Sequence, residues 1–141
     1  MSLFSLLSVS ASGMEAQRTR AALLVENLAN AETTRTPEGG PYRRKDPVFQ
    51  AVLQGITPDG TPLTGVQVAG VQASKDPFIE KFDPNHPDAD PQTGVVKFPN
   101  VNPVEEMVNL TEASRSFEAN VAVVRAVRAM ELSAQDLLRV Q

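Results

Sequence analysis

The sequence predicts an α+β fold: long N- and C-terminal helices pair as an antiparallel coiled-coil-like unit, with a small β-rich domain inserted between them. The first observation behind this prediction is that all 11 prolines lie between Pro37 and Pro103, together with seven of the eight glycines. The second is that apolar residues recur at three- and four-residue steps in both proline-free ends. We therefore expect an N-terminal helix region over residues 1–36, a β-rich outer domain over 37–103 and a C-terminal helix over 104–141.

The first predicted helix is firm only in its second half. Four serines between residues 5 and 12, followed by Gly13, disfavour helix in the first dozen residues. We therefore expect a firm helix from about Met14 and a conditional one before it. The apolar stripe of this helix consists of Leu3, Leu7, Ala11, Met14, Ala21, Val25 and Leu28.

The second predicted helix has a strong start signal in the segment NPVEE. Asn102 suits the N-cap, Pro103 suits the first helical position, and Glu105 follows the cap by three residues. Glu106 adds negative charge near the positive end of the helix dipole. A helix to the end of the chain would be roughly 50 Å long. Its apolar series is Met107, Leu110, Ser114, Phe117, Val121, Val124, Val127, Met130, Ala134 and Leu137.

The middle of the chain contains short strand-like segments between turn residues. We expect strands at residues 48–53, 65–74, 78–82 and 94–98. The segment TPDGTP, residues 57–62, predicts a turn in which Asp59 and Gly60 supply positive φ angles. These strands contain little apolar mass, so we expect the β region to lean on another part of the molecule.

Composition argues against several classes of function. The net charge is −4 and Arg43-Arg44-Lys45 is the one basic block, so we expect no nucleic acid partner and interpret the block as a charged strand edge. One histidine, no cysteine and scattered serines offer no nucleophile–base pair, so we expect no enzyme activity and no catalytic residues. No glycine-rich phosphate loop is present, and we expect no cofactor and no small-molecule substrate.

Two sequence features bear on cellular location. No apolar run approaches the roughly 20 residues that a membrane-spanning helix needs. The N-terminal segment MSLFSLLSVSASG lacks the charged start and the long apolar centre of a secretory signal, so we expect no cleaved signal peptide. Export by a route without cleavage stays open.

An acidic loop offers an alternative function. Residues 82–91, FDPNHPDADP, contain the single histidine, His86, among several carboxylates, which is a composition that a divalent metal could use. The loop lacks the glycine and the later glutamate of the twelve-residue calcium loop, and we interpret it as a solvated turn cluster with no metal. The alternative is a secreted or periplasmic binding module that uses residues 83–90 to hold a divalent metal.

The predicted architecture leaves apolar surface uncovered, because two paired helices rarely form a stable core alone. We therefore expect the helices to pack against other chains, or to stay partly disordered in the monomer. A contact between different patches of two copies would propagate as a helical array. The predicted subunit interface contains the apolar residues Met14, Val25, Leu28, Leu110, Phe117, Val121 and Val124, with Asn27, Asn30, Asn109 and Asn120 as polar markers of the alignment.

Two segments resemble a known family. NLANAET, residues 27–33, resembles the Asn-Leu-Ala-Asn signature near the N-terminus of bacterial flagellar rod and hook proteins, and residues 100–127 resemble their C-terminal segment. The extra residues before Tyr42, the segment at 86–107 and the short length resemble the C-type proximal rod proteins of that family. The chain departs from the family pattern at GGPY, which stands where Pro-Gly-Tyr is usual.

The resemblance implies a structural subunit of the proximal rod, the drive shaft of the flagellar basal body, which transmits torque. It implies export without cleavage by the flagellar type III apparatus and a place in the rod within the periplasm. Its partners would be other rod proteins and copies of itself, joined through terminal helices that are poorly ordered before assembly. The segment FQAVL has the spacing attributed to export-gate recognition, although Phe49 and Leu53 are also explained as strand-face residues.

Overall fold

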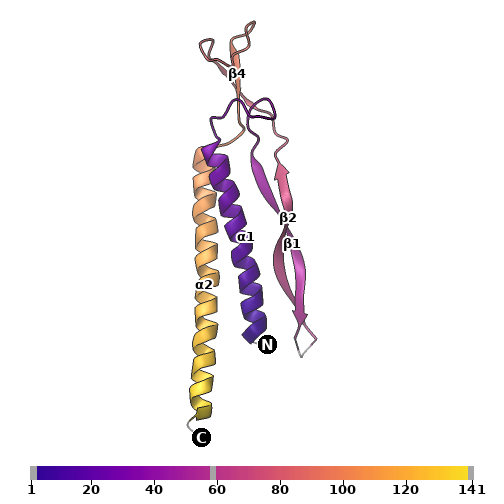
Figure 1. The fold of residues 1–141 in the computed structure, drawn as a ribbon, viewed down its shortest axis with the longest axis vertical. Helices are drawn as coiled ribbons and strands as arrows, with labels where there is room; N and C mark the ends of the chain where they lie inside the picture. The colour runs from indigo at the N-terminus through magenta and orange to yellow at the C-terminus, as the bar shows by residue number, and fades with distance from the viewer. Residues whose placement is uncertain (1–2, 58–59, 140–141) are drawn as a thin grey trace.

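The computed structural model describes residues 3–57 and 60–139. Within these residues the elements are two helices and four strands: α1 (Leu3–Ala29), β1 (Lys45–Ile56), β2 (Pro62–Ala73), β3 (Ile79–Phe82), β4 (Val95–Phe98) and α2 (Pro103–Arg139). The helices lie side by side and are antiparallel, because α1 begins and α2 finishes toward the same end of the molecule (Figure 1). The predicted α+β fold, with paired terminal helices and a small β region between them, is confirmed.

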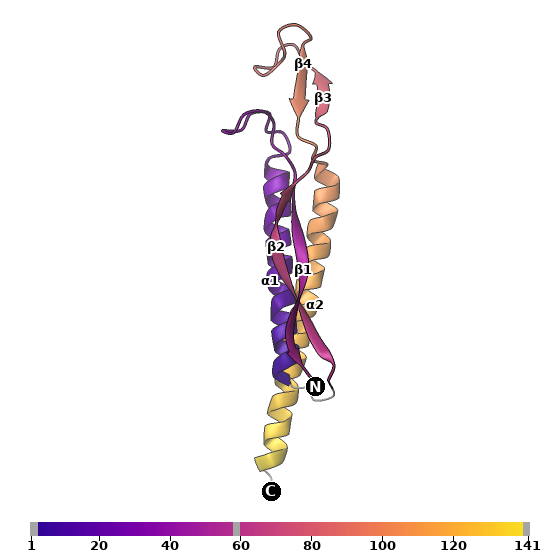
Figure 2. The ribbon, with the colours of Figure 1, turned by 90° about the vertical axis from the view of Figure 1, so that its right-hand side faces the viewer.

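The strands form two separate hairpins. The β1–β2 hairpin is antiparallel, from Lys45 opposite Ala73 to Ile56 opposite Pro62, and it runs along the helix pair (Figure 2). The β3–β4 hairpin lies beyond the end of the helices from which α2 starts. All four predicted strands are confirmed, although β1 and the start of β2 extend beyond their predicted ends. Two separate hairpins have little core of their own, and the longer one packs on α1.

The turn between β1 and β2 has the expected glycine geometry. Gly60 has a φ of 78°, and its amide donates to the Thr57 carbonyl at 2.9 Å. Asp59, which we expected to share the positive φ, lies outside the described residues. A residue with positive φ here suits the tight reversal of the hairpin.

Helix α1 starts earlier than the firm prediction, because the hairpin supports its first half. The Ser8 hydroxyl donates to Gln54 Oε1 at 2.7 Å, and Ser12 Oγ accepts from the Val66 amide at 3.2 Å. Serine weakens an isolated helix, but here two of the serines bind the hairpin that lies against the helix. The segment that the sequence left conditional is therefore helical from Leu3.

Helix α2 starts as predicted. Asn102 Oδ1 accepts from the Val104 amide at 3.1 Å, and Pro103 is the first helical residue. Glu106 lies in the first turn as predicted, but its side chain is only 1% exposed and also binds residues outside α2. In the described part of the chain, no helix is both long and apolar enough to cross a membrane.

The core is thin and follows faces that the apolar series predicted only in part. Leu24 is buried, whereas its neighbour Val25, which the stripe included, is 51% exposed; likewise Glu106 is buried and Met107 is 50% exposed. Near Leu24 and Glu106 the inward faces are thus displaced by one residue from the predicted stripes, whereas Val127, a member of the predicted series, is buried. Apolar residues occur on more than one side of each helix, so periodicity alone does not choose the side that pairs. The buried apolar residues are Ala16, Leu23, Leu24, Tyr42, Val96, Val101, Ala113 and Val127.

Gly65 tests the close approach of hairpin and helix. A Cβ at this position would come within 2.7 Å of both Ser12 Oγ and Gln54 Cγ. We expect Gly65→Ala to lower the free energy of unfolding by about 1–3 kcal/mol, because crowded atoms must shift. Urea denaturation measures this loss, and amide hydrogen exchange at Val66 reports whether the hairpin leaves α1.

Gly70→Ala is the matched control, because Gly70 is in the same strand and nothing lies within 4 Å of its added Cβ. Equal stability changes in the two variants would contradict the tight hairpin–helix contact.

Candidate functional site

The end of α1, the start of β1 and the start of α2 meet at the fully buried side chain of Asn27. Asn27 Nδ2 donates to the Lys45 carbonyl at 2.9 Å and to Glu106 Oε2 at 3.1 Å. Asn27 Oδ1 accepts from the Tyr42 hydroxyl and from the Lys45 amide, both at 2.9 Å. Both donors and the acceptor oxygen of this amide are therefore used within the chain. We call Asn27, Tyr42, Arg44, Lys45 and Glu106 the junction.

Glu106 supplies the negative charge of the junction. Its Oε1 accepts from Arg44 Nε at 2.6 Å, while its Oε2 faces Asn27. Arg44 also forms an ion pair with Asp46 at 3.2 Å. A buried carboxylate is costly unless it is paired and hydrogen-bonded, and here both oxygens have partners.

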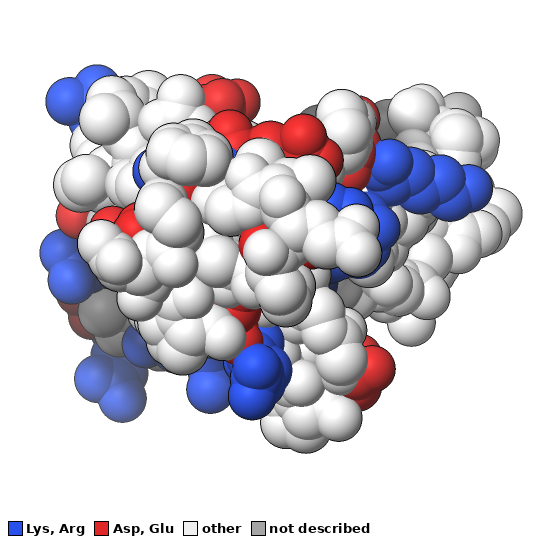
Figure 3. All heavy atoms as spheres, turned by 90° about the horizontal axis from the view of Figure 1, so that it is seen from above, with Lys and Arg blue, Asp and Glu red and all other residues white. Residues whose placement is uncertain are grey.

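The basic block at residues 43–45 is used within the chain. The Arg43 guanidinium lies 4.2 Å from the centroid of the Phe78 ring, and Lys45 Nζ pairs with Glu26 at 2.6 Å. Viewed from the end that carries β3 and β4, Lys and Arg lie in several separate groups, with Asp and Glu scattered among them (Figure 3). The described residues on this face therefore form no single large basic patch.

The other predicted asparagines lie at the helix pair or at its end. Asn30 Nδ2 donates to the Glu26 carbonyl at 2.9 Å, just after the last residue of α1. Asn109 Oδ1 accepts from Arg20 at 3.4 Å across the pair. Asn120 lies against Gly13, where an added Cβ would come within 3.2 Å of its amide. Asn109 and Asn120 thus contact α1 in the same chain, while Asn30 helps to end that helix.

The predicted apolar interface residues are partly open to solvent. Val25 is 51% exposed and Phe117 is 38% exposed. The others are half-buried: Met14, Leu28, Leu110, Val121 and Val124. Further exposed apolar residues on α2, outside our predicted interface, are Val104, Met107, Val108, Val123, Met130, Leu132 and Leu137. The single chain therefore leaves apolar surface uncovered along the whole of α2.

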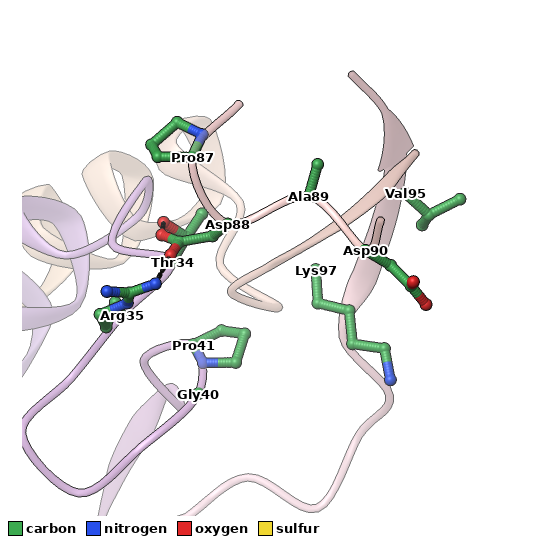
Figure 4. Close-up of a pocket in the computed structure, with 10 residues that line it drawn as sticks. All are labelled: Thr34, Arg35, Gly40, Pro41, Pro87, Asp88, Ala89, Asp90, Val95 and Lys97. Atoms are coloured by element: carbon green, nitrogen blue, oxygen red, sulfur yellow. Dashed lines mark hydrogen bonds and ion pairs between the residues drawn. The ribbon is translucent and has the colours of Figure 1, made fainter. Parts of the chain in front are cut away.

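The acidic loop is tied to the segment after α1. Asp88 Oδ2 accepts from the Thr34 hydroxyl at 2.8 Å, and Asp88 Oδ1 pairs with Arg35 (Figure 4). These contacts border a hollow of about 380 Å³, in which Asp90 and Lys97 point away from that pair. The hydrogen bond from Thr34 and the charge of Arg35 hold the pKa of Asp88 below its usual value, against the effect of desolvation.

The same loop shows the turn bonds that we expected. Asp83 Oδ1 accepts from the backbone amide of Asn85 at 3.2 Å, and Asp90 Oδ1 accepts from the backbone amide of Gln92 at 2.9 Å. Across residues 3–57 and 60–139, no three His, Cys, Asp or Glu side chains are grouped so that they could hold a metal ion. The structure does not favour the metal-binding alternative.

Comparisons with known proteins cover almost the whole chain. Residues 92–137 match the family model described as flagellar basal body rod FlgEFG protein C-terminal. The flagellar basal-body rod protein FlgC of Borreliella burgdorferi is 39% identical, over 99% of each chain. FlgC of Escherichia coli O157:H7 is 42% identical over 94% of this chain and 95% of its own, and FlgC of Bacillus subtilis is 37% identical over 97% and 99%.

The chain belongs to the FlgC family of flagellar basal-body rod proteins. The suspected resemblance is confirmed. The relatives bear the names of rod proteins rather than of enzymes, which is consistent with the expectation of no enzyme activity. The match to the C-terminal family model spans most of α2, including Glu106 and the exposed apolar residues.

No sequence pattern placed four of the junction residues of this FlgC-family chain at the site: Tyr42, Arg44, Lys45 and Glu106. Tyr42 and Arg44 lie in the loop just before β1. Glu106 follows Glu105, which has the same side chain and is exposed. No local pattern separates the two glutamates. Only the position of α1 across the start of α2 decides which of them is buried.

Tyr42 provides a spectroscopic test of the junction. Burial, followed by the charges of Glu26 and Glu106, raises the pKa of Tyr42 from 10.0 to about 12. Tyr42 is the one tyrosine and tryptophan is absent, so ultraviolet absorbance follows its ionisation alone. We expect a midpoint near pH 12 in the folded chain and near 10 in urea. The folded state holds this proton more tightly, so the stabilisation is complete below pH 10 and is lost as pH rises towards 12.

Glu26→Gln is expected to lower this midpoint, whereas Glu105→Gln is the matched control that leaves it unchanged. A folded-state midpoint equal to that in urea would show that the phenol is not held in the junction.

Proposed function

We propose that this chain is a structural subunit of the proximal rod of the flagellar basal body, built into the rod through its terminal helices. The observation that carries the proposal is the exposed apolar surface of α2, from Val104 at 67% exposure to Leu137 at 75%. Family membership supplies the rod, and this surface supplies a means of assembly.

The inward face of α2 is narrow, and apolar residues lie on its other sides. Glu106, Ala113 and Val127 are buried, at seven-residue steps or a multiple of them. Exposed Met107, Val123 and Met130 do not belong to that line. A helix with apolar residues on several sides needs several neighbours. Fully burying one such side chain contributes about 1.5–3 kcal/mol, so a few contacts per subunit offset much of the cost of association.

The two helices also differ in length. Helix α1 has 27 residues and α2 has 37, and the C-terminal part of α2 continues beyond the N-terminal end of α1 (Figure 1). Leu132 and Leu137 near this free end are 63% and 75% exposed. A projecting helix end that meets a different patch on the next copy makes a contact that repeats as a helical array.

We also propose the partners of this chain, its export route and its mechanical role. The partners are other flagellar rod proteins and copies of this chain in the rod within the periplasm, and the route is uncleaved export by the flagellar type III apparatus. Phe49 and Leu53 of FQAVL are exposed on β1, where the export apparatus or a neighbouring subunit could reach them. Torque passes through packed helix–helix contacts, because closely packed interiors deform little under load.

Replacing Phe117 by Asp tests the assembly surface. Phe117 is 38% exposed, so the single chain tolerates the change better than a core position would. We expect Phe117→Asp to abolish swimming and to remove the protein from isolated basal bodies, because a charge would be buried between subunits. Immunoblots of cell fractions and basal bodies, together with motility assays, measure this.

Phe117→Leu is the matched control, since it keeps an apolar side chain, and it is expected to retain most motility. Normal swimming by Phe117→Asp would overturn the assignment of this surface.

A further inference from the structure

We infer that the buried Asn27–Glu106 contact is a register lock, which fixes the one alignment in which α1 and α2 pair within a chain. This inference concerns the single chain and goes beyond the proposed function. Asn27 is 0% exposed and Glu106 is 1% exposed, and the amide donates to the carboxylate at 3.1 Å. In this inference Asn27 and Glu106 bind no ligand; their contact sets how α1 and α2 are aligned.

The contacts across the helix pair follow one register. Asn27 meets Glu106 near one end, and Gly13 meets Asn120 two seven-residue steps further along. Between them Arg20 reaches Glu112 at 3.2 Å. From Asn27 to Gly13 α1 descends 14 residues while α2 ascends 14 residues from Glu106 to Asn120, and Arg20–Glu112 lies within one residue of the midpoint. All three contacts therefore belong to the same antiparallel alignment.

The apolar part of this contact discriminates poorly between alignments. Its buried residues include the small side chains of Ala16 and Ala113, with Leu23 and Val127 as larger members. After a slip of seven residues in either direction, Ala16 would face Leu110 or Val124, and Leu23 would face Pro103 or Phe117, all of which are apolar. Apolar seams with a heptad repeat tolerate such slips, and a buried polar residue is the device that excludes them.

A slip would leave a buried carboxylate without its partners. Glu106 is paired with the Asn27 side-chain amide and with Arg44. Arg44 is held in place because Asn27 binds both the backbone amide and the carbonyl of the next residue, Lys45. One seven-residue slip moves the helices by roughly 10 Å along their axes, too far for either bond. The unpaired charge strongly disfavours every slipped alignment.

The lock has a consequence for the surface that the chain presents. The alignment decides how much of α2 extends beyond α1 and therefore which apolar residues stay uncovered (Figure 1). A slip of roughly 10 Å would cover part of this free end or lengthen it. Subunits locked in one register all offer their neighbours the same surface.

Disulfide trapping distinguishes a register lock from a merely stabilising contact. The natural chain contains no cysteine, so introduced pairs report alone. The pair Gly13→Cys with Asn120→Cys reports the observed register. The pairs Gly13→Cys with Ala113→Cys and Gly13→Cys with Val127→Cys report slips in the two directions. A disulfide requires Cα atoms within about 7 Å, so each pair forms in only one register.

We expect the otherwise unchanged full-length chain to cross-link at 13/120 in at least tenfold excess over both slipped pairs. In the Asn27→Leu/Glu106→Leu background, apolar residues replace the buried polar pair, which often preserves stability while specificity is lost. We expect the slipped pairs to rise there by tenfold or more relative to 13/120. Circular dichroism follows helix content in the same samples.

Glu105→Leu is the matched control, because Glu105 neighbours Glu106 and is exposed. It should leave the cross-linking pattern unchanged. Exclusive 13/120 cross-linking in the double variant would overturn the lock, as would absence of that cross-link in the otherwise unchanged chain. If the double variant loses helix content, the single variant Glu106→Gln, which keeps the shape of the side chain, decides the matter by the same criterion.

Discussion

The fold depends on one buried polar contact, between the amide of Asn27 and the carboxylate of Glu106. The chain has no tryptophan and no cysteine, and the buried apolar residues in the part that the structure describes are mainly alanine, valine and leucine, so neither a thick core nor disulfides hold the elements together. A buried carboxylate, by contrast, has narrow requirements: it is tolerated only with charge and hydrogen-bond partners around it. Arg44 and Asn27 satisfy it from two other elements, so the end of α1, the start of β1 and the start of α2 must converge.

The hairpin placement follows from that convergence. The Asn27 side chain binds both the backbone amide and the carbonyl of Lys45, as a neighbouring strand would, at the residue where β1 begins. From this root the β1–β2 hairpin runs along α1, and Gly65 permits its close approach to Ser12. The hairpin covers part of α1 and leaves α2 open. A chain with so thin a core and so much uncovered apolar surface is suited to a packed assembly, which is the setting that membership of the FlgC family indicates.

Much of the fold was readable from local patterns. The cap at Asn102, the proline at the first helical position and the strand segments between turn residues are all confirmed. Serines weaken an isolated helix, so local patterns predict only a conditional first half of α1, and the hairpin that uses Ser8 and Ser12 cannot be placed from the sequence. The apolar stripes were displaced by one residue from the inward faces at two places, since Val25 and Met107 are exposed beside buried Leu24 and Glu106.

The sequence by itself determined the order of the elements, the start of α2, the glycine in the hairpin turn and the family. These depend on interactions between residues close in the chain, or on signatures carried by short segments. Only the tertiary structure decided which helix faces pair, which of two adjacent glutamates is buried, and why an asparagine stands at position 27. Asn27 and Glu106 are 79 residues apart, and their contact exists only in one alignment of two long helices. Local propensity contains no information about that alignment, because it is selected by the cost of leaving a buried charge unpaired.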